Sequence, residues 1–224
     1  MIISKIKLFT NQLEAEKRFY HDVLGFQYVE NTPQHFTVQI GHTALTFEQT
    51  DAAHRYHYCF LIPSNQLHNA ISWLKERLDI YEIEPGRIIQ RFESWNAESV
   101  YFHDGSGNLA EFIVRYDLNN ETNHPFSESD IISLNEIGMP TNDINALNTQ
   151  LANTLHTTFW KGDLERFGTH GSQEGLFLLP NYEVKSTWFP SNVKIDLAPF
   201  EATVLNEGKT FQVIYKNGIV AINE

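Results

Sequence analysis

Three short segments of similar sequence recur along this chain, each between a predicted strand and a predicted helix. They are Thr10-Asn11-Gln12-Leu13, Ser64-Asn65-Gln66-Leu67 and Thr141-Asn142-Asp143-Ile144. A single match of this length means little, but three at the same kind of junction indicate an internal repeat. The spacing between them is uneven. The chain is therefore predicted to contain a few related modules rather than a regular solenoid.

The hydrophobic pattern around the first two junctions predicts the same order of elements twice. In the first unit, a strand over 2–10 precedes a helix over 13–24 and three short strands. In the second, a strand from 56 to 62 precedes a helix over 67–78 and three further strands that end at 115. Residues 1–117 are thus predicted to form two strand–helix–three-strand (βαβββ) modules.

The rest of the chain predicts a third module and part of a fourth. Residues 118–130 are polar and lack periodicity, which is typical of a linker. A third strand–helix–strand pattern starts at Ile131. Beyond residue 190 we expect strands but no helix, and Asn217-Gly218 predicts a hairpin there. Residues 131–224 are therefore predicted to hold a third module and a degenerate fourth.

Composition excludes several classes of partner. The net charge of −12 makes nucleic acid and anionic membrane surfaces poor partners. Cys59 is the only cysteine, which excludes an internal disulfide and a cysteine-cluster zinc site. No apolar run approaches the length of a membrane span, and the first ten residues alternate like a strand rather than a signal peptide. We expect a cytoplasmic protein.

The stretch Tyr101–Arg115 predicts a strand, a tight turn and a returning strand that carries a carboxylate. Two glycines within residues 104–108 suit the turn. Glu111 follows among apolar residues and, by strand alternation, shares a face with Ile113 and Arg115. A carboxylate in such surroundings is paired, hydrogen-bonded, bound to a metal, or on a solvated face.

Three motifs resemble the vicinal oxygen chelate superfamily, which includes glyoxalase I, bleomycin-resistance proteins and extradiol dioxygenases. They are FYHDVLGF at 19–26, HYCF at 57–60 and DGSGNLAEF at 104–112. The resemblance implies an α+β fold of repeated βαβββ modules that form cupped mixed sheets. It implies two module pairs, the first within residues 1–117 and the second ending in a module without its helix.

The resemblance also implies a divalent metal in the cup, held by the first strand of one module and by two strands of its partner. Carried over position by position, these places are Lys5, His57 and Glu111. The last two suit Fe(II), Mn(II) or Zn(II). An ammonium has no lone pair and cannot ligate, so Lys5 is predicted to pair with Glu111 instead of a metal. A metal with another third ligand, such as Glu48, is the alternative.

Other candidates for the site are aromatic or lie at equivalent places. Glu136 occupies in the third module the place that Lys5 has in the first. Tyr101 and His103 are predicted to line the cup and bind the ligand. A further aromatic group could either wall a pocket for a planar ligand or fill the core between modules, and it comprises Trp95, Trp188 and Phe189.

The sequence leaves three functions open. The first is a metal-free binder of a small molecule, whose metal site is incomplete because Lys5 replaces a ligand and is instead available to bind an anionic ligand. The second is a metal-dependent lyase or extradiol-type dioxygenase that uses His57, Glu111 and an unidentified third ligand. The third is a scaffold that serves protein contacts only. We expect a monomer or a homodimer, and we commit to the first function.

Overall fold

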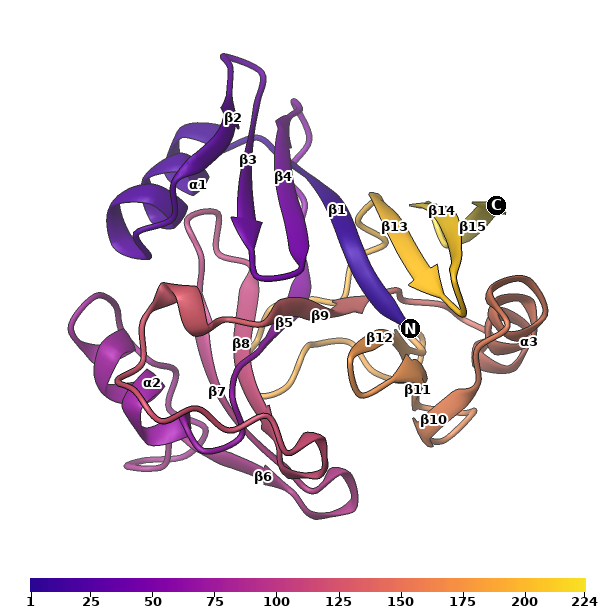
Figure 1. Cartoon of the computed structure of the whole chain (residues 1–224). Coiled ribbons are helices and arrows are strands. Elements are labelled where there is room, and N and C mark those ends of the chain that lie inside the picture. The colour runs from indigo at the N-terminus through magenta and orange to yellow at the C-terminus, as the bar shows by residue number, and fades with distance from the viewer.

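Two curved mixed β-sheets and three helices make up the structure, a computed structural model that describes all residues 1–224 (Figure 1). Sheet A has seven strands and sheet B has eight. The predicted α+β fold of repeated βαβββ modules in cupped sheets is confirmed.

Each of the first three modules runs strand, helix and three strands. The first holds β1 (Ile2–Thr10), α1 (Leu13–Arg18, continued as a π-helix over Phe19–Val23), β2 (Tyr28–Asn31), β3 (His35–Ile40) and β4 (Thr43–Gln49). The second holds β5 (His57–Leu61), α2 (Leu67–Lys75), β6 (Gln90–Phe92), β7 (Ala97–His103) and β8 (Leu109–Arg115). The third holds β9 (Ser133–Gly138), α3 (Ile144–Leu155), β10 (Phe159–Gly162), β11 (Phe167–Ser172) and β12 (Gly175–Pro180).

The repeated junctions lie where the sequence predicts them, directly before each helix. The Thr10 hydroxyl accepts a hydrogen bond from the Gln12 amide at 3.0 Å, and Thr141 accepts one from Asp143 at the same distance. Asp143 then caps α3 by accepting from the Ala146 amide at 2.9 Å. These local bonds satisfy backbone groups at the helix start, whereas at the second junction the Gln66 amide donates to the Pro63 carbonyl instead.

The modules pair differently from the prediction. In sheet A, β1 lies antiparallel to β13 (Phe200–Asn206), so the first module joins the fourth. In sheet B, β5 lies antiparallel to β9, so the second module joins the third. The expectation that the modules of residues 1–117 share one cup is therefore wrong. Residues 118–130 lead from β8 to β9 without a strand, and each cup is completed within one chain.

The fourth module has three strands and no helix, as expected. It consists of β13, β14 (Lys209–Lys216) and β15 (Ile219–Asn223), each antiparallel to the next. A parallel neighbour would need a crossover connection, and no helix is present to provide one. The hairpin between β14 and β15 turns at Asn217 and Gly218, which both have positive φ, as the Asn-Gly signal predicts.

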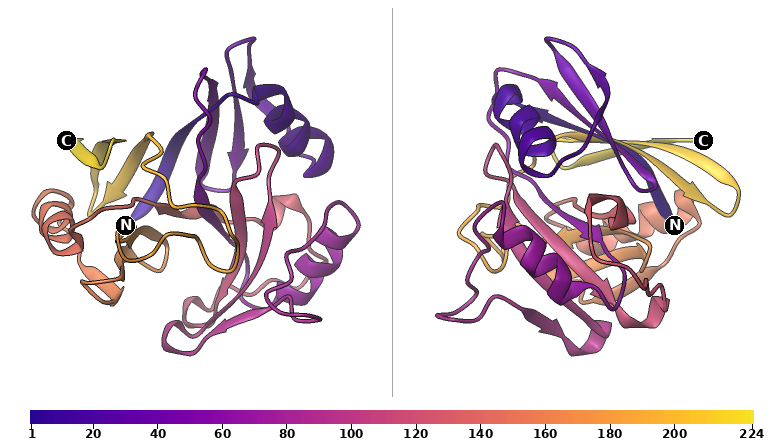
Figure 2. Two further views of the ribbon diagram at one scale, coloured as in Figure 1. Left: turned by 180° about the vertical axis from the view of Figure 1, so that it is seen from behind. Right: turned by 60° about the vertical axis from the view of Figure 1, so that its left-hand side comes forward.

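Strand alternation gives each sheet two faces with different surroundings. The faces that carry the helices share one large core, to which both sheets contribute buried aromatic residues such as Phe36 and Phe112. The other face of sheet B is covered by the long segment 181–199, which precedes β13 and is orange in Figure 2. We call this segment the strap. The other face of sheet A has no such cover, and Ile214 and Ile219 are exposed there. None of the helices has both the length and the apolar character that crossing a membrane requires.

Candidate binding site in the second sheet

A pocket of about 310 Å³ lies between the strap and the face of sheet B that carries no helices. Most of its walls are apolar or aromatic, and four of its side chains are ionisable His, Glu or Lys. The lining residues are His57, Phe92, Trp95, Tyr101, Glu111, Glu136, Phe167, Leu178, Lys185, Trp188 and Phe189. Pockets that bind small molecules have this mixture of apolar walls and a few convergent polar groups.

The floor of the pocket is a row of side chains from four adjacent strands. Cys59 on β5 is in register with Glu136 on β9 and with Glu111 on β8. Glu111 is in turn in register with Tyr101 on β7. Partners in register share a face of the sheet, so these side chains point the same way. His57, two residues before Cys59 on β5, lies on that face as well.

His57 and Glu111 face one another at the centre of the floor. The Nε2 atom of His57 is 3.4 Å from Oε2 of Glu111, and both side chains are buried. His57 Nδ1 lies 3.0 Å from the Leu109 carbonyl oxygen, which can only accept, so Nδ1 carries the ring proton. Nε2 of the neutral ring is then an acceptor directed at the carboxyl group.

The ionisation of this pair follows from its burial. Burial lowers the pKa of His57 to about 4, and the positive charge of Lys185 adds to that effect. Burial, followed by the charge of Glu136, raises the pKa of Glu111 to about 8, while the Ser99 and Tyr101 hydroxyls and Arg115 oppose this rise. At neutral pH the pair therefore holds one proton, which resides on Glu111 and can be donated to Nε2.

Glu136, the other carboxylate of the floor, is bound by Arg115. The Arg115 guanidinium donates to Glu136 from β8, and its side chain is fully buried. Burial raises the pKa of Glu136, while Arg115 opposes that rise. The rings of Trp160 and Trp95 lie 4.9 and 5.3 Å from the guanidinium carbon and shield it from water.

The residues of this floor do not fit the divalent metal that the fold family implies. No group of three or more His, Cys, Asp or Glu side chains is placed to hold a metal ion. His57 and Glu111 supply two donors, but the nearest further carboxylate, Glu136, is already neutralised by Arg115. A buried guanidinium beside the site also repels a dication.

The strap closes the pocket from above. The ring of Trp188 lies 4.9 Å from the His57 ring and packs on the backbone of Gly138. A Cβ atom at position 138 would lie only 2.6 Å from that ring, so the close approach requires glycine. Phe189 is 46% exposed and forms part of the mouth. The cover thus leaves one side of the pocket open to solvent.

The structure brings together three of the five predicted site residues. His57, Glu111 and Tyr101 all line the pocket. His103 is exposed at the end of β7, where its ring contacts the Asn108 carbonyl, and it does not line the pocket. Lys5 is also exposed, and it lies in sheet A between Thr203 and Ala44. The predicted pairing of Lys5 with Glu111 is therefore wrong, because their modules belong to different sheets.

Sequence reasoning missed several residues of the site, although some carried a signal. Arg115 lies on the face of Glu111, as strand alternation predicts, and a charge that is buried in an apolar strand needs a partner of opposite sign. The sequence indicates that Glu136 occupies in the third module the position of Lys5 in the first, but it does not assign Glu136 to the same cup as Glu111. Lys185 carries no local signal, because only the path of the strap brings it to the pocket.

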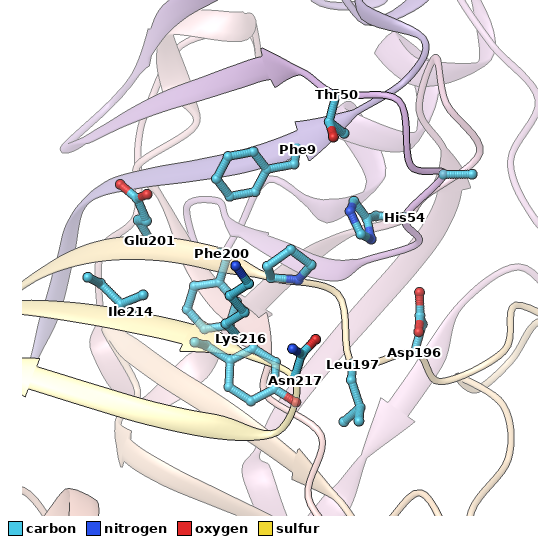
Figure 3. Close-up of a pocket in the computed structure, with 13 residues that line it drawn as sticks. Phe9, Thr50, His54, Asp196, Leu197, Phe200, Glu201, Ile214, Lys216 and Asn217 are labelled. Carbon is cyan, nitrogen blue, oxygen red and sulfur yellow. The ribbon is translucent and has the colours of Figure 1, made fainter.

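A larger groove of about 630 Å³ lies at the end of sheet A (Figure 3). His54, Asp196 and Lys216 approach it from the loop after β4, the strap and β14. None of the buried carboxylates of sheet B has a counterpart among its lining residues. Of these two pockets, only the one in sheet B is lined by buried carboxylates and a buried histidine.

Two module pairs, each built around a cupped sheet with βαβββ order, define the class of protein to which this chain belongs. Residues 2–112 match the model of the Glyoxalase/Bleomycin resistance protein/Dioxygenase superfamily. The chain is a member of that superfamily.

Solved structures are similar over most of the chain. A putative dioxygenase from Bacillus subtilis subsp. subtilis str. 168 is 14% identical, with a TM-score of 0.59, over 98% of this chain and 83% of its own. A point variant of glyoxalase I from Zea mays is 12% identical, with a TM-score of 0.54, over 80% of this chain and 67% of its own. At such identities the likeness concerns the fold. No curated protein sequence matches the chain.

Proposed function

We propose that this protein binds a small planar molecule in the cup of sheet B without the help of a metal ion. The observation that carries this proposal is a pair of facing polar side chains, His57 and Glu111, whose Nε2 and Oε2 atoms are 3.4 Å apart at the floor of a pocket with aromatic walls. Aromatic side chains offer flat apolar surfaces for a ring, while a few polar groups fix its orientation.

The floor offers a ligand one donor and one acceptor. Protonated Glu111 can give a hydrogen bond to a carbonyl or hydroxyl oxygen, and Nε2 of His57 can accept one from a hydroxyl. The two atoms are 3.4 Å apart, a loose contact that a ligand oxygen can replace with better bonds. A planar molecule with an oxygen substituent therefore suits both the walls and the floor.

The metal-dependent lyase or dioxygenase is the second candidate, and the orientation of His57 favours it. Metal-bound histidines usually donate their other ring N–H to a carbonyl or carboxylate, as His57 does to Leu109. This candidate needs a third ligand, and Glu136 can serve only if it leaves Arg115. The proposed incompleteness of the metal site thus rests on Arg115 rather than on Lys5.

A binding experiment tests the first candidate. Titration with 2-naphthamide, a neutral planar probe, is followed by tryptophan fluorescence and by calorimetry. Trp188→Ala removes a wall of the cup and is expected to weaken binding at least tenfold. The control Phe9→Ala removes a wall of the groove of Figure 3 and is expected to leave the affinity unchanged. Equal loss in both variants, or no saturable binding, contradicts the proposal.

Elemental analysis separates the two candidates. Protein purified without a histidine tag is expected to carry less than one tenth of a divalent ion per chain, and EDTA is expected to leave probe binding unchanged. One ion per chain that is lost on Glu111→Gln would favour the metal-dependent enzyme instead.

A further inference from the structure

Lys185 is a cation of the cup that has no carboxylate partner. It lies on the strap, is half-buried, and lines the pocket together with Trp188. Its ammonium is 5.7 Å from the centre of the Trp188 ring and donates to the carbonyl of Thr187. Lys185 takes part in none of the ion pairs of the chain. Partial burial of an ammonium without a counter-ion is unfavourable, which points to an anion that arrives from solution.

The other charges of the cup cancel one another. Arg115 and Glu136 form a closed ion pair. His57 and Glu111 share one proton, so their sum is zero whichever of them holds it. Lys185 therefore remains as the uncompensated charge of the pocket.

The surroundings of Lys185 reinforce this positive character. The charged group that acts on its pKa is another cation, Arg166, which lines a neighbouring depression together with Lys185 and Phe189. Burial, and then the charge of Arg166, lower the pKa of Lys185 to about 8, so the ammonium remains mostly charged at neutral pH. The net charge of the whole chain is −12, so its overall electrostatic field does not attract anions. Attraction of an anion to this pocket therefore depends on the local positive charges of Lys185 and Arg166.

We propose that the molecule bound in the sheet B cup is a planar aromatic carboxylate whose single negative charge pairs with Lys185 while its ring lies against Trp188 and Tyr101. This inference rests on the proposed function, because it specifies the ligand of the same pocket. One uncompensated lysine matches one carboxylate. A neutral ring of the same shape would leave the ammonium unpaired.

Two probes of equal shape test this proposal. The affinity of 2-naphthoate is compared with that of 2-naphthamide by calorimetry at pH 7. The native protein is expected to bind the carboxylate at least tenfold more tightly than the amide. Lys185→Met, which keeps an apolar stem of similar length, is expected to reduce this ratio to about one. Lys185→Arg keeps the charge and is expected to retain most of the ratio.

The control and the outcomes keep this inference separate from the proposed function. Lys5→Met removes an exposed cation of sheet A and is expected to leave the ratio unchanged. If both probes bind the native protein equally and Trp188→Ala weakens both, the carboxylate proposal is wrong while the planar-ligand proposal stands. If neither probe binds, both proposals fall. The two affinities of the native protein decide the question even if a variant folds poorly.

Discussion

The two cups of this protein place charged groups at comparable positions but in very different surroundings. In sheet A, Lys7 lies 3.3 Å from both Glu48 and Glu201, and the three side chains are 34–46% exposed. In sheet B, Arg115 pairs with Glu136 while both are almost fully buried. The same chain thus contains an exposed ion-pair cluster and a buried one on related strands.

The strap accounts for the difference. It crosses sheet B and covers the floor with Trp188, Val193 and Ile195, whereas no segment crosses the corresponding face of sheet A. Once water is excluded, each charge must be matched or neutralised, because the interior screens charges poorly. This comparison indicates that a cup becomes a binding site through its cover, since the related strands of sheet A, which lack one, leave their charged groups partly exposed.

Breaking one ion pair in each cup is expected to give the largest difference in stability between the two sheets. Arg115→Met leaves Glu136 buried without a partner, which is expected to lower the free energy of unfolding by about 3–5 kcal/mol. Lys7→Met breaks exposed pairs and is expected to cost less than about 1 kcal/mol. Urea unfolding measures both. Arg115→Met combined with Glu136→Met is expected to recover most of the loss, and equal losses in the two single variants would contradict the contrast.

Removal of the main anchor of the strap tests its role as a cover. Trp188→Ala deletes a ring that is 3% exposed and packs on Gly138, with an expected cost of about 3 kcal/mol. Hydrogen exchange is expected to rise mainly within residues 181–199. Ile214→Ala, at a 43% exposed position of sheet A, is expected to change stability by less than about 0.5 kcal/mol. Protection that stays unchanged in the strap would show that Trp188 is not its anchor.

The modules were predictable from sequence because their signals are local. The strand–helix junctions are marked by Thr10 and Thr141, whose hydroxyls bond within two residues, and Gly25, whose φ is +87°, ends the first helical segment. The turn before β8 placed Glu111 on a strand, and alternation placed it on the face of Arg115. Each of these inferences depends on neighbours in the chain.

The pairing of the modules was not predictable in the same way. The first strand of each module is apolar on at least one face. The residues of β1 therefore do not by themselves determine whether it pairs with β5 or with β13. The choice is made by contacts between residues about 200 positions apart, as between Ile3 and Val204. The error about Lys5 followed directly from the wrong pairing. Lys185 was missed for a related reason, because an irregular segment carries no periodic pattern.

The buried carboxyl group of Glu111 is expected to make the free energy of unfolding depend on pH. Glu111 has a pKa of about 8 when folded and an ordinary, lower pKa when unfolded, so the unfolded chain loses this proton first as pH rises. Its contribution to stability is fully present below the unfolded pKa and is lost as pH rises through about 8. Relative to Glu111→Gln, the native protein is expected to lose about 1 kcal/mol of unfolding free energy between pH 6 and pH 7.

His57 changes stability in the opposite direction, which is why the comparison with Glu111→Gln is needed. The pKa of His57 is lowered to about 4 in the folded protein, so its contribution is lost as pH falls through that value. Both proteins retain His57, and the difference between their urea-unfolding profiles isolates Glu111. Glu201→Gln, on the exposed sheet, provides the matched control. Parallel native and Glu111→Gln profiles would show that Glu111 is not held protonated by burial.

The smallest effect is expected from an attempt to build a metal site in the exposed cup. Lys7 lies between Glu48 and Glu201, so Lys7→His would place one imidazole between two carboxylates on three adjacent strands, a donor set that suits Zn(II) or Mn(II). Since a metal ion that binds only the folded state stabilises it, Zn(II) at about five times its dissociation constant is expected to add about 1 kcal/mol to the unfolding free energy. The gain should fade at acidic pH as the imidazole protonates.

Thermal melts of Lys7→His, Lys5→His and the native protein, each with and without Zn(II), make the measurement. Lys5→His is the control because position 5 is in register with Thr203 and Ala44, which offer no carboxylate. An equal response of the two variants would mean that the ion binds elsewhere. A strong response of the native protein would point to the cup of sheet B and would place a metal there after all.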